Sequence, residues 1–309
     1  MSVADTTASG ARVVAAIAVP LDAGAELPVK SRSYWGSVLG RLRRDPVTLV
    51  CAGILLTIFL SAVFAPLIVE ADPYKTSMLR RLQAVGLPNH LLGTDELGRD
   101  MIARLIYGGR LSLMMGTVPV LNALLIGGLL GVTAGFVGGK VNMLIMRTID
   151  VFYAFPSVLL AIAISGALGA GLMNSIVALT IVFIPPIARV SESVTTSVRS
   201  LDFVEAARAS GARGWTIIRV HILGNVLGPI FIYATGLISV AIILASGLSF
   251  LGLGVKPPEP EWGLMLNTLR QSIWVNPVVA ALPGAMIFVT SICFNLMSDG
   301  LRSAMDVKL

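Results

Sequence analysis

The chain has 309 residues, of which 55% are hydrophobic and 13% are charged, and its mean hydropathy is +0.85. Soluble domains average about 25% charged residues, so this composition excludes an ordinary soluble protein and indicates an integral membrane protein. The formal net charge of +6 requires no nucleic-acid partner, because the arginines and lysines collect beside the apolar segments, where anionic lipid attracts them. Those segments approach the roughly 20 residues that cross a bilayer as a helix.

Residues 1–45 are predicted to form a cytoplasmic tail, because the stretch is polar and poor in aromatic residues. The apolar patch from Val13 to Val19 stops at Pro20, which argues against a cleaved signal peptide. Most of the tail is therefore expected to be disordered. Towards its end, we interpret Tyr34 to Leu42 as an interfacial helix.

Six spans are predicted within a transmembrane domain of residues 46–309. They cover about 47–69, 111–137, 143 onwards with an interruption at Pro156, 172–194, 230–253 and 277–297. Three arginines precede the first span and two carboxylates follow it, so the positive-inside rule places its N-terminal end in the cytoplasm. An even number of spans then places both termini and the polar segment 198–228 in the cytoplasm, and segment 71–110 outside.

The polar segment 198–228 is predicted to contain a short helix. Asp202 stands three residues before Glu205, which suits a capping box with Asp202 as N-cap. Three alanines continue the helix at low cost, and Gly211 can end it in the left-handed conformation. A second, amphipathic segment from Trp215 to Leu223 is predicted to lead into the next span.

Few polar residues lie within the predicted spans. Arg147 and Asp150 are three residues apart, a spacing that suits a structural intrahelical pair. Asn122 and Asn295 face either a water-filled pathway or a neighbouring helix, to which they would hydrogen-bond. Glycines at helical spacing in the second span predict close helix packing; they are Gly127, Gly128, Gly131 and Gly135.

Other functional classes are disfavoured by the sequence. Gly139-Lys140 is followed by Val141 rather than by Ser or Thr, so the chain lacks a phosphate-binding loop for ATP. His90 and His221 both fall outside the spans, which argues against an intramembrane Ser/His protease. The two cysteines show no metal-ligand spacing. The middle of each span lacks a carboxylate or lysine, which argues against an ion-coupled secondary transporter, the main alternative.

Several motifs resemble the permeases of ABC importers. The polar segment carries Glu205-Ala206-Ala207 and then Gly211, similar to the coupling loop that docks on the ATPase in that family. The segments Gly93–Asp100, Leu248–Gly254 and Asp299–Arg302 resemble the dipeptide/oligopeptide class of these permeases, as does Glu261-Trp262-Gly263. The resemblance covers about Tyr34 to Leu309, and it is to the C-type subunit of that class.

The resemblance implies an all-α, six-span fold of the type I importer kind, and a transport subunit of the bacterial inner membrane rather than an enzyme. It implies as partners a homologous B-type permease, two cytoplasmic ATPase subunits that bind ATP and Mg, an extracytoplasmic substrate-binding protein and membrane lipid, without nucleic acid. The residues expected to couple to the ATPases are Phe203, Glu205, Ala206, Ala207, Arg208, Gly211 and Ala212.

The resemblance also implies that the chain forms half of a translocation pathway, for which Asn122 and Asn295 are the candidate lining residues. Members of the class import dipeptides, oligopeptides, glutathione, nickel chelates or opine-like compounds. The sequence leaves the choice among these solutes open.

Overall fold

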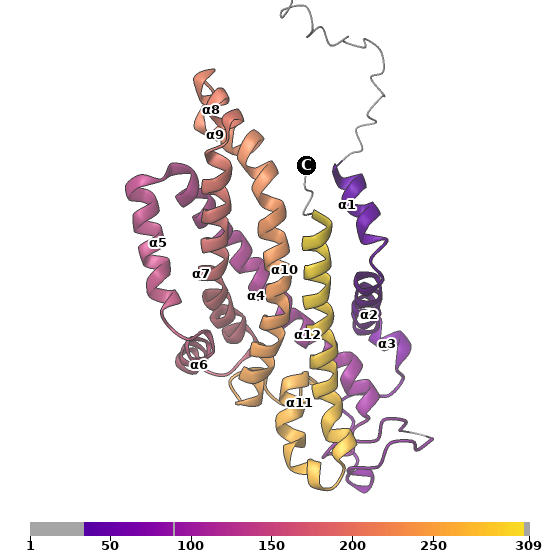
Figure 1. The fold of residues 1–309 in the computed structure, drawn as a ribbon. Coiled ribbons are helices and arrows are strands. Elements are labelled where there is room, and N and C mark those ends of the chain that lie inside the picture. The colour runs from indigo at the N-terminus through magenta and orange to yellow at the C-terminus, as the bar shows by residue number, and fades with distance from the viewer. Residues whose placement is uncertain (1–33, 89, 306–309) are drawn as a thin grey trace, which may run out of the picture. The chain divides into compact units, whose positions relative to one another are not determined.

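The structure is a computed structural model that describes residues 34–88 and 90–305. Within these ranges every regular element is a helix, as the sequence predicts, and Figure 1 shows how the helices are arranged. The predicted tail of residues 1–33 lies outside the described residues. The helices are α1 (Tyr34–Leu42), α2 (Pro46–Val63), α3 (Ala65–Ile68), α4 (Met101–Val137), α5 (Gly139–Tyr153), α6 (Ser157–Leu168), α7 (Leu172–Arg199), α8 (Asp202–Ala209), α9 (Gly214–Ile217), α10 (Leu223–Phe250), α11 (Trp262–Leu269) and α12 (Pro277–Met305).

Five helical segments among the described residues are long and apolar enough to cross a membrane. They are α2, α4, α7, the segment Gly214–Phe250 that includes α10, and α12. Helices α5 and α6 meet this criterion only as a pair, and the pair is bent by 86°. The break falls at Pro156, which precedes α6 and has no N–H to donate to a continuing helix. The described chain thus has five candidate spans, or six when the bent pair counts as one.

Helix α4 begins at Met101, ten residues before the predicted second span, so the last ten residues of the predicted external loop 71–110 are helical. The Asp100 carboxylate accepts a hydrogen bond from the Ala103 N–H at 2.9 Å, which caps the helix. Arg104 is 2% exposed, and its Nε lies 3.1 Å from Asp95 Oδ2. Because Arg104 lowers the local hydropathy, an apolar window misses the first turns of α4.

The candidate spans on either side of α8 are Leu172–Arg199 and Gly214–Phe250, so both reach into the predicted polar segment 198–228. Helix α7 continues to Arg199, and a π-helical turn, Ile218–Ile222, joins α9 directly to α10. Ile217 and Ile222 are buried, so the apolar face of the span extends beyond its predicted start at 230. Exposed polar residues such as Arg219 lower the mean hydropathy of this segment, so its apolar face is not evident from the sequence. Residues 200–222 are named the α8 loop below.

Helices α4 and α7 pack closely because glycines of α4 face α7. A Cβ on Gly127 would lie 2.7 Å from the Ile184 carbonyl oxygen, and one on Gly135 would lie 2.7 Å from the Glu192 carbonyl oxygen. A Cβ on Gly131, halfway between them, would overlap the backbone of α7. The predicted close packing is therefore confirmed at these three glycines, whereas Gly128 faces open space.

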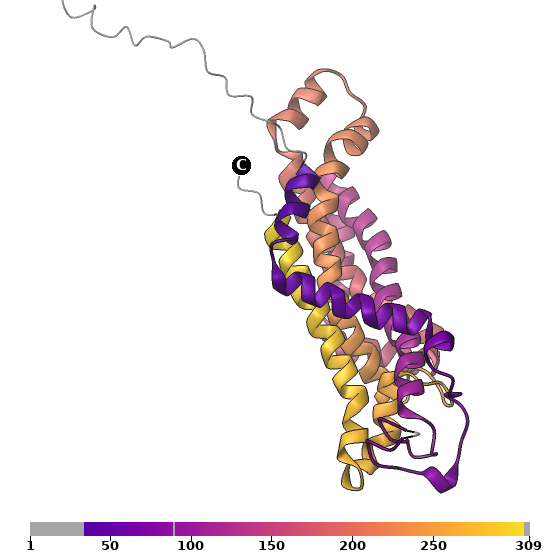
Figure 2. The same cartoon turned by 90° about the vertical axis from the view of Figure 1, so that its right-hand side faces the viewer.

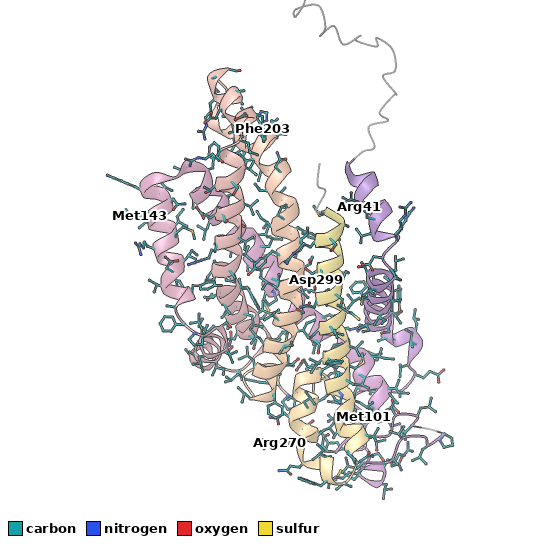
Figure 3. All side chains as sticks on the ribbon, in the orientation of Figure 1. Arg41, Met101, Met143, Phe203, Arg270 and Asp299 are labelled. Atoms are coloured by element: carbon teal, nitrogen blue, oxygen red, sulfur yellow. The ribbon has the colours of Figure 1, made fainter. Side chains whose placement is uncertain are left out.

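The long helices of residues 38–309 place different elements at their two ends. Helices α8 and α9 extend beyond the neighbouring helices at one end, towards which the C-terminal end of α12 also points (Figures 1 and 2). Helix α11 and residues 71–88 and 90–100 lie at the opposite end (Figures 1 and 2). Phe203 marks the first end in Figure 3, and Met101 and Arg270 mark the second. The main apolar cluster lies among α4, α7 and α10, and a second one surrounds Trp262 at the α11 end.

Candidate functional site

The α8 loop contains all seven residues expected to couple to an ATPase, but its helix begins differently from the prediction. Leu201 is the N-cap and provides no side-chain cap, so the predicted capping box with Asp202 as N-cap is wrong. Helix α7 runs on to Arg199, and the tight turn that follows it moves the start of α8 to Asp202. Asp202 and Glu205 still share the first turn, where carboxylates interact favourably with the helix dipole.

Gly211 ends α8 in the predicted left-handed conformation, with a φ of +80°. The Gly211 N–H donates to the Arg208 carbonyl at 2.9 Å, and the Ala212 N–H donates to the Ala207 carbonyl at 3.1 Å. These two bonds make up the Schellman motif. Ala207 and Ala212 both pack against the main apolar cluster, and so provide the apolar contact that accompanies this motif.

The α8 loop is anchored on the ends of α4 and α7. Val204 is fully buried in the main apolar cluster. The Arg208 guanidinium lies 5.8 Å from the centre of the Phe136 ring, a cation–π contact with the last turn of α4. Arg199 Nη1 donates to the carbonyl oxygens of Gly135 and Phe136 at 3.0 and 3.1 Å. A displacement of the loop would therefore move the ends of both helices.

The outer surface of the α8 loop is largely exposed. Phe203, Glu205, Ala206, Arg208 and Gly211 are exposed, whereas Ala207 and Ala212 are half-buried. The Glu205 side chain makes no hydrogen bond or ion pair with the described residues. A short alanine-rich helix of this kind permits close approach of another surface, and the free carboxylate of Glu205 is available to a cationic group of a partner.

Trp215 on α9 is an exposed residue that the expected set omits. Its side chain is 72% exposed, whereas Ile217 and Ile222 on the same helical segment are buried. The sequence gives no clear signal for this exposure, because Trp215 and Ile222 are seven residues apart and would share a face of an unbroken α-helix. The π-helical turn Ile218–Ile222 changes that phase. Exposed tryptophan is enriched among the residues that dominate protein interfaces.

The expected structural pair of Arg147 and Asp150 does not form. Asp150 of α5 instead makes an ion pair with Arg189 of α7, and the Arg189 guanidinium also lies 4.8 Å from the centre of the Tyr153 ring. The Arg147 side chain makes no hydrogen bond or ion pair with the described residues. The pair therefore joins two helices, which a spacing of three along one helix cannot reveal.

Asn122 and Asn295, the candidate pathway residues, lie in different places. Asn295 is exposed on α12 and lines a groove of about 510 Å³ between α10, α11 and α12. Asn122 is half-buried on α4 and is not among the lining residues of that groove. Neither side chain hydrogen-bonds to the described residues.

Glu261 organises the opposite end of the molecule, a role that sequence analysis does not assign. It is fully buried and caps α11, accepting hydrogen bonds from the N–H groups of Gly263 and Leu264 at 2.9 and 2.8 Å. The Ser112 hydroxyl of α4 donates to the same carboxylate at 3.0 Å. Burial raises the pKa of Glu261, although these donors oppose the shift. The Glu-Trp-Gly motif is thus a joint between α4 and α11.

The fold and the loop together define a class: an all-helical, multi-pass membrane protein with an anchored, exposed helix between two of its spans. A family model described as the binding-protein-dependent transport system inner membrane component matches residues 127–308. The N-terminal TM domain of oligopeptide transport permease C matches residues 33–84. The chain belongs to the binding-protein-dependent transport permease family. It is therefore an inner-membrane permease subunit of an ABC importer rather than an ion-coupled secondary transporter.

Similar proteins agree with this assignment. The chain is 41% identical over 277 residues to the dipeptide transport system permease protein DppC of Alkalihalophilus pseudofirmus, covering 90% of this chain and 91% of the relative. It is 40% identical over 278 residues to the glutathione transport system permease protein GsiD of Pectobacterium atrosepticum, with 90% and 92% covered. A solved structure of the MetNI methionine ABC transporter in an inward-facing conformation aligns with a TM-score of 0.55 and 20% identity, covering 66% of this chain and 97% of that chain, and it shares the fold.

Proposed function

We propose that this chain is the C-type permease of an importer for peptides or peptide-like solutes. The support is that the relatives described above are named as dipeptide and glutathione permeases, and that residues 33–84 match a domain of oligopeptide permease C. A homologous B-type permease supplies the other half of the pathway. An extracytoplasmic binding protein delivers the solute to the α11 end.

The α8 loop couples this permease to two cytoplasmic ATPase subunits, which bind ATP and Mg. The observation that carries this role is the combination of an exposed outer surface with an anchored inner one, because a docking element must offer contacts and also transmit displacement. Glu205 and Trp215 face outward, while Val204 and Arg208 attach the loop to the helices beneath. The α8 loop and both termini of the chain face the cytoplasm.

Reconstitution of the importer tests this proposal. Vesicles that contain this permease, its B-type relative and the ATPases should import radiolabelled dialanine when ATP and the loaded binding protein are supplied on their respective sides. Leaving out the B-type permease should abolish import, since each permease forms only half of the pathway. Import by this chain alone, driven by an ion gradient and without ATP, would contradict the proposal.

A further inference from the structure

The groove between α10, α11 and α12 runs along the axis of α12. Gly284 and Leu266 lie near its α11 end, and Asn295 lies at the other. Gly284 and Asn295 are separated by about 16 Å along the helix axis, which is about half of the roughly 30 Å hydrocarbon core of a bilayer. The side chains of Phe288 and Ile292 are 65% and 41% exposed along this length, so the described chain leaves the groove uncovered.

The lining of the groove is apolar, with three hydrogen-bonding side chains and no charged residue. The three are Ser239 of α10 and Ser291 and Asn295 of α12. Ser291 is 6% exposed, and its hydroxyl oxygen is buried without a hydrogen-bond partner among the described residues. The Asn295 amide, one turn further along the same face, also lacks a partner. The volume of about 510 Å³ falls in the range of roughly 300–1,000 Å³ that small-molecule sites occupy.

The chemistry of the groove discriminates among three occupants. A lipid tail would leave the Asn295 amide without a hydrogen bond, which is costly in a dry environment. A helix of the second permease satisfies its own backbone groups and offers only side chains. An extended peptide presents an N–H and a C=O at each residue, so it can bond the Asn295 amide with both a donor and an acceptor while an apolar side chain fills the rest.

We infer that this groove is a transit subsite for the peptide, in which one apolar side chain packs against Ile243 and Phe288 and the backbone hydrogen-bonds to the exposed Asn295. The inference rests on the proposed function, because it assumes that the solute passes this face. The lack of charge in the groove matches the uncharged middle of a peptide. It also keeps the interaction weak, and a site on a conduction path must release what it binds.

The experiment compares the import of a small and a bulky dipeptide by the reconstituted importer. Dialanine and diphenylalanine are supplied with saturating binding protein, so that capture outside the membrane does not limit the rate. Gly284→Leu narrows the groove at its α11 end, where an added Cβ would lie 3.6 Å from Leu266 Cδ2. Gly53→Leu is the matched control, because Gly53 is an exposed helical glycine on α2 with open space around it.

In Gly284→Leu, the ratio of diphenylalanine to dialanine import should fall about 5- to 10-fold relative to wild type, whereas Gly53→Leu should leave the ratio unchanged. Asn295→Ala removes the amide that bonds the peptide without adding volume, and so serves as a second variant that does not overpack the groove. It should slow import of both peptides about 2- to 10-fold, as expected for the loss of one hydrogen bond, with assembly intact.

The outcomes separate the alternatives. If Gly284→Leu prevents assembly with the B-type permease, the groove holds a helix of that subunit and the inference is overturned. If Gly284→Leu behaves like Gly53→Leu, the groove faces lipid, which also overturns it. The proposed function fails differently, because in that case the wild-type importer itself does not transport dipeptides.

Discussion

The conformation of Gly211 allows the proposed coupling role of the α8 loop to be tested separately from folding. The residue has a φ of +80°, and a side chain in the left-handed region costs about 1–2 kcal/mol, with a β-branched residue the least suited. A Cβ at this position would meet no other atom within 4 Å, so the strain in Gly211→Val comes from the backbone alone. Gly211→Asn is the matched control, because asparagine tolerates this conformation.

In Gly211→Val, the strain is relieved when the end of α8 unwinds and the N–H groups of Gly211 and Ala212 lose their partners. If an ATPase binds only the intact end, a penalty of about 1–2 kcal/mol weakens its binding roughly 5- to 30-fold. The thermal stability of the purified permease should change little, since the packed helices do not depend on this turn. The dissociation constant of the ATPase and the ATP hydrolysis stimulated by loaded binding protein are the measurements. Equal values for Gly211→Val and Gly211→Asn would refute the reasoning.

Three further predictions follow from packing, titration and topology. Gly131→Leu should lower the melting temperature and the yield of folded protein, because overpacking at the contact of α4 with α7 costs about 1–3 kcal/mol or more, whereas Gly128→Leu at the neighbouring open position should not. Burial raises the pKa of Glu261, so its protonated form stabilises the fold below the ordinary glutamate pKa, and this stability is lost as pH rises through the raised pKa. Between those two pKa values the melting temperature should fall with rising pH in wild type and vary less in Glu261→Gln. In a background without native cysteines, an impermeant thiol reagent applied outside should label Lys256→Cys and not Ser200→Cys, and the reverse pattern would contradict the proposed orientation.

Sequence patterns predict the parts of the fold that depend on neighbours along the chain. Pro156 breaks a helix because it lacks an N–H, and Gly211 ends one because it accepts a positive φ. Both effects are local, so each is visible in the sequence. The glycines at 127, 131 and 135 reveal close packing because their spacing places them on one helix face.

Contacts between distant residues could not be predicted in the same way. Asp150 pairs with Arg189, 39 positions along the chain, because the bend after α5 brings it beside α7, whereas the sequence suggests only the nearer Arg147. Ser112 and Glu261 are 149 residues apart, and no periodicity relates them. The start of α4 cannot be predicted from hydropathy, because the charge of Arg104 lowers the local hydropathy. In the structure Arg104 is buried and pairs with Asp95.

The stacking of α4 on α7 also has a mechanical consequence. Gly127, Gly131 and Gly135 each fit against the backbone of α7, so the two helices are in close contact at three successive turns. Sliding one helix along the other would drive backbone against backbone at three places at once. A displacement of α8, which follows α7 after a short turn, would therefore move α4 and α7 together.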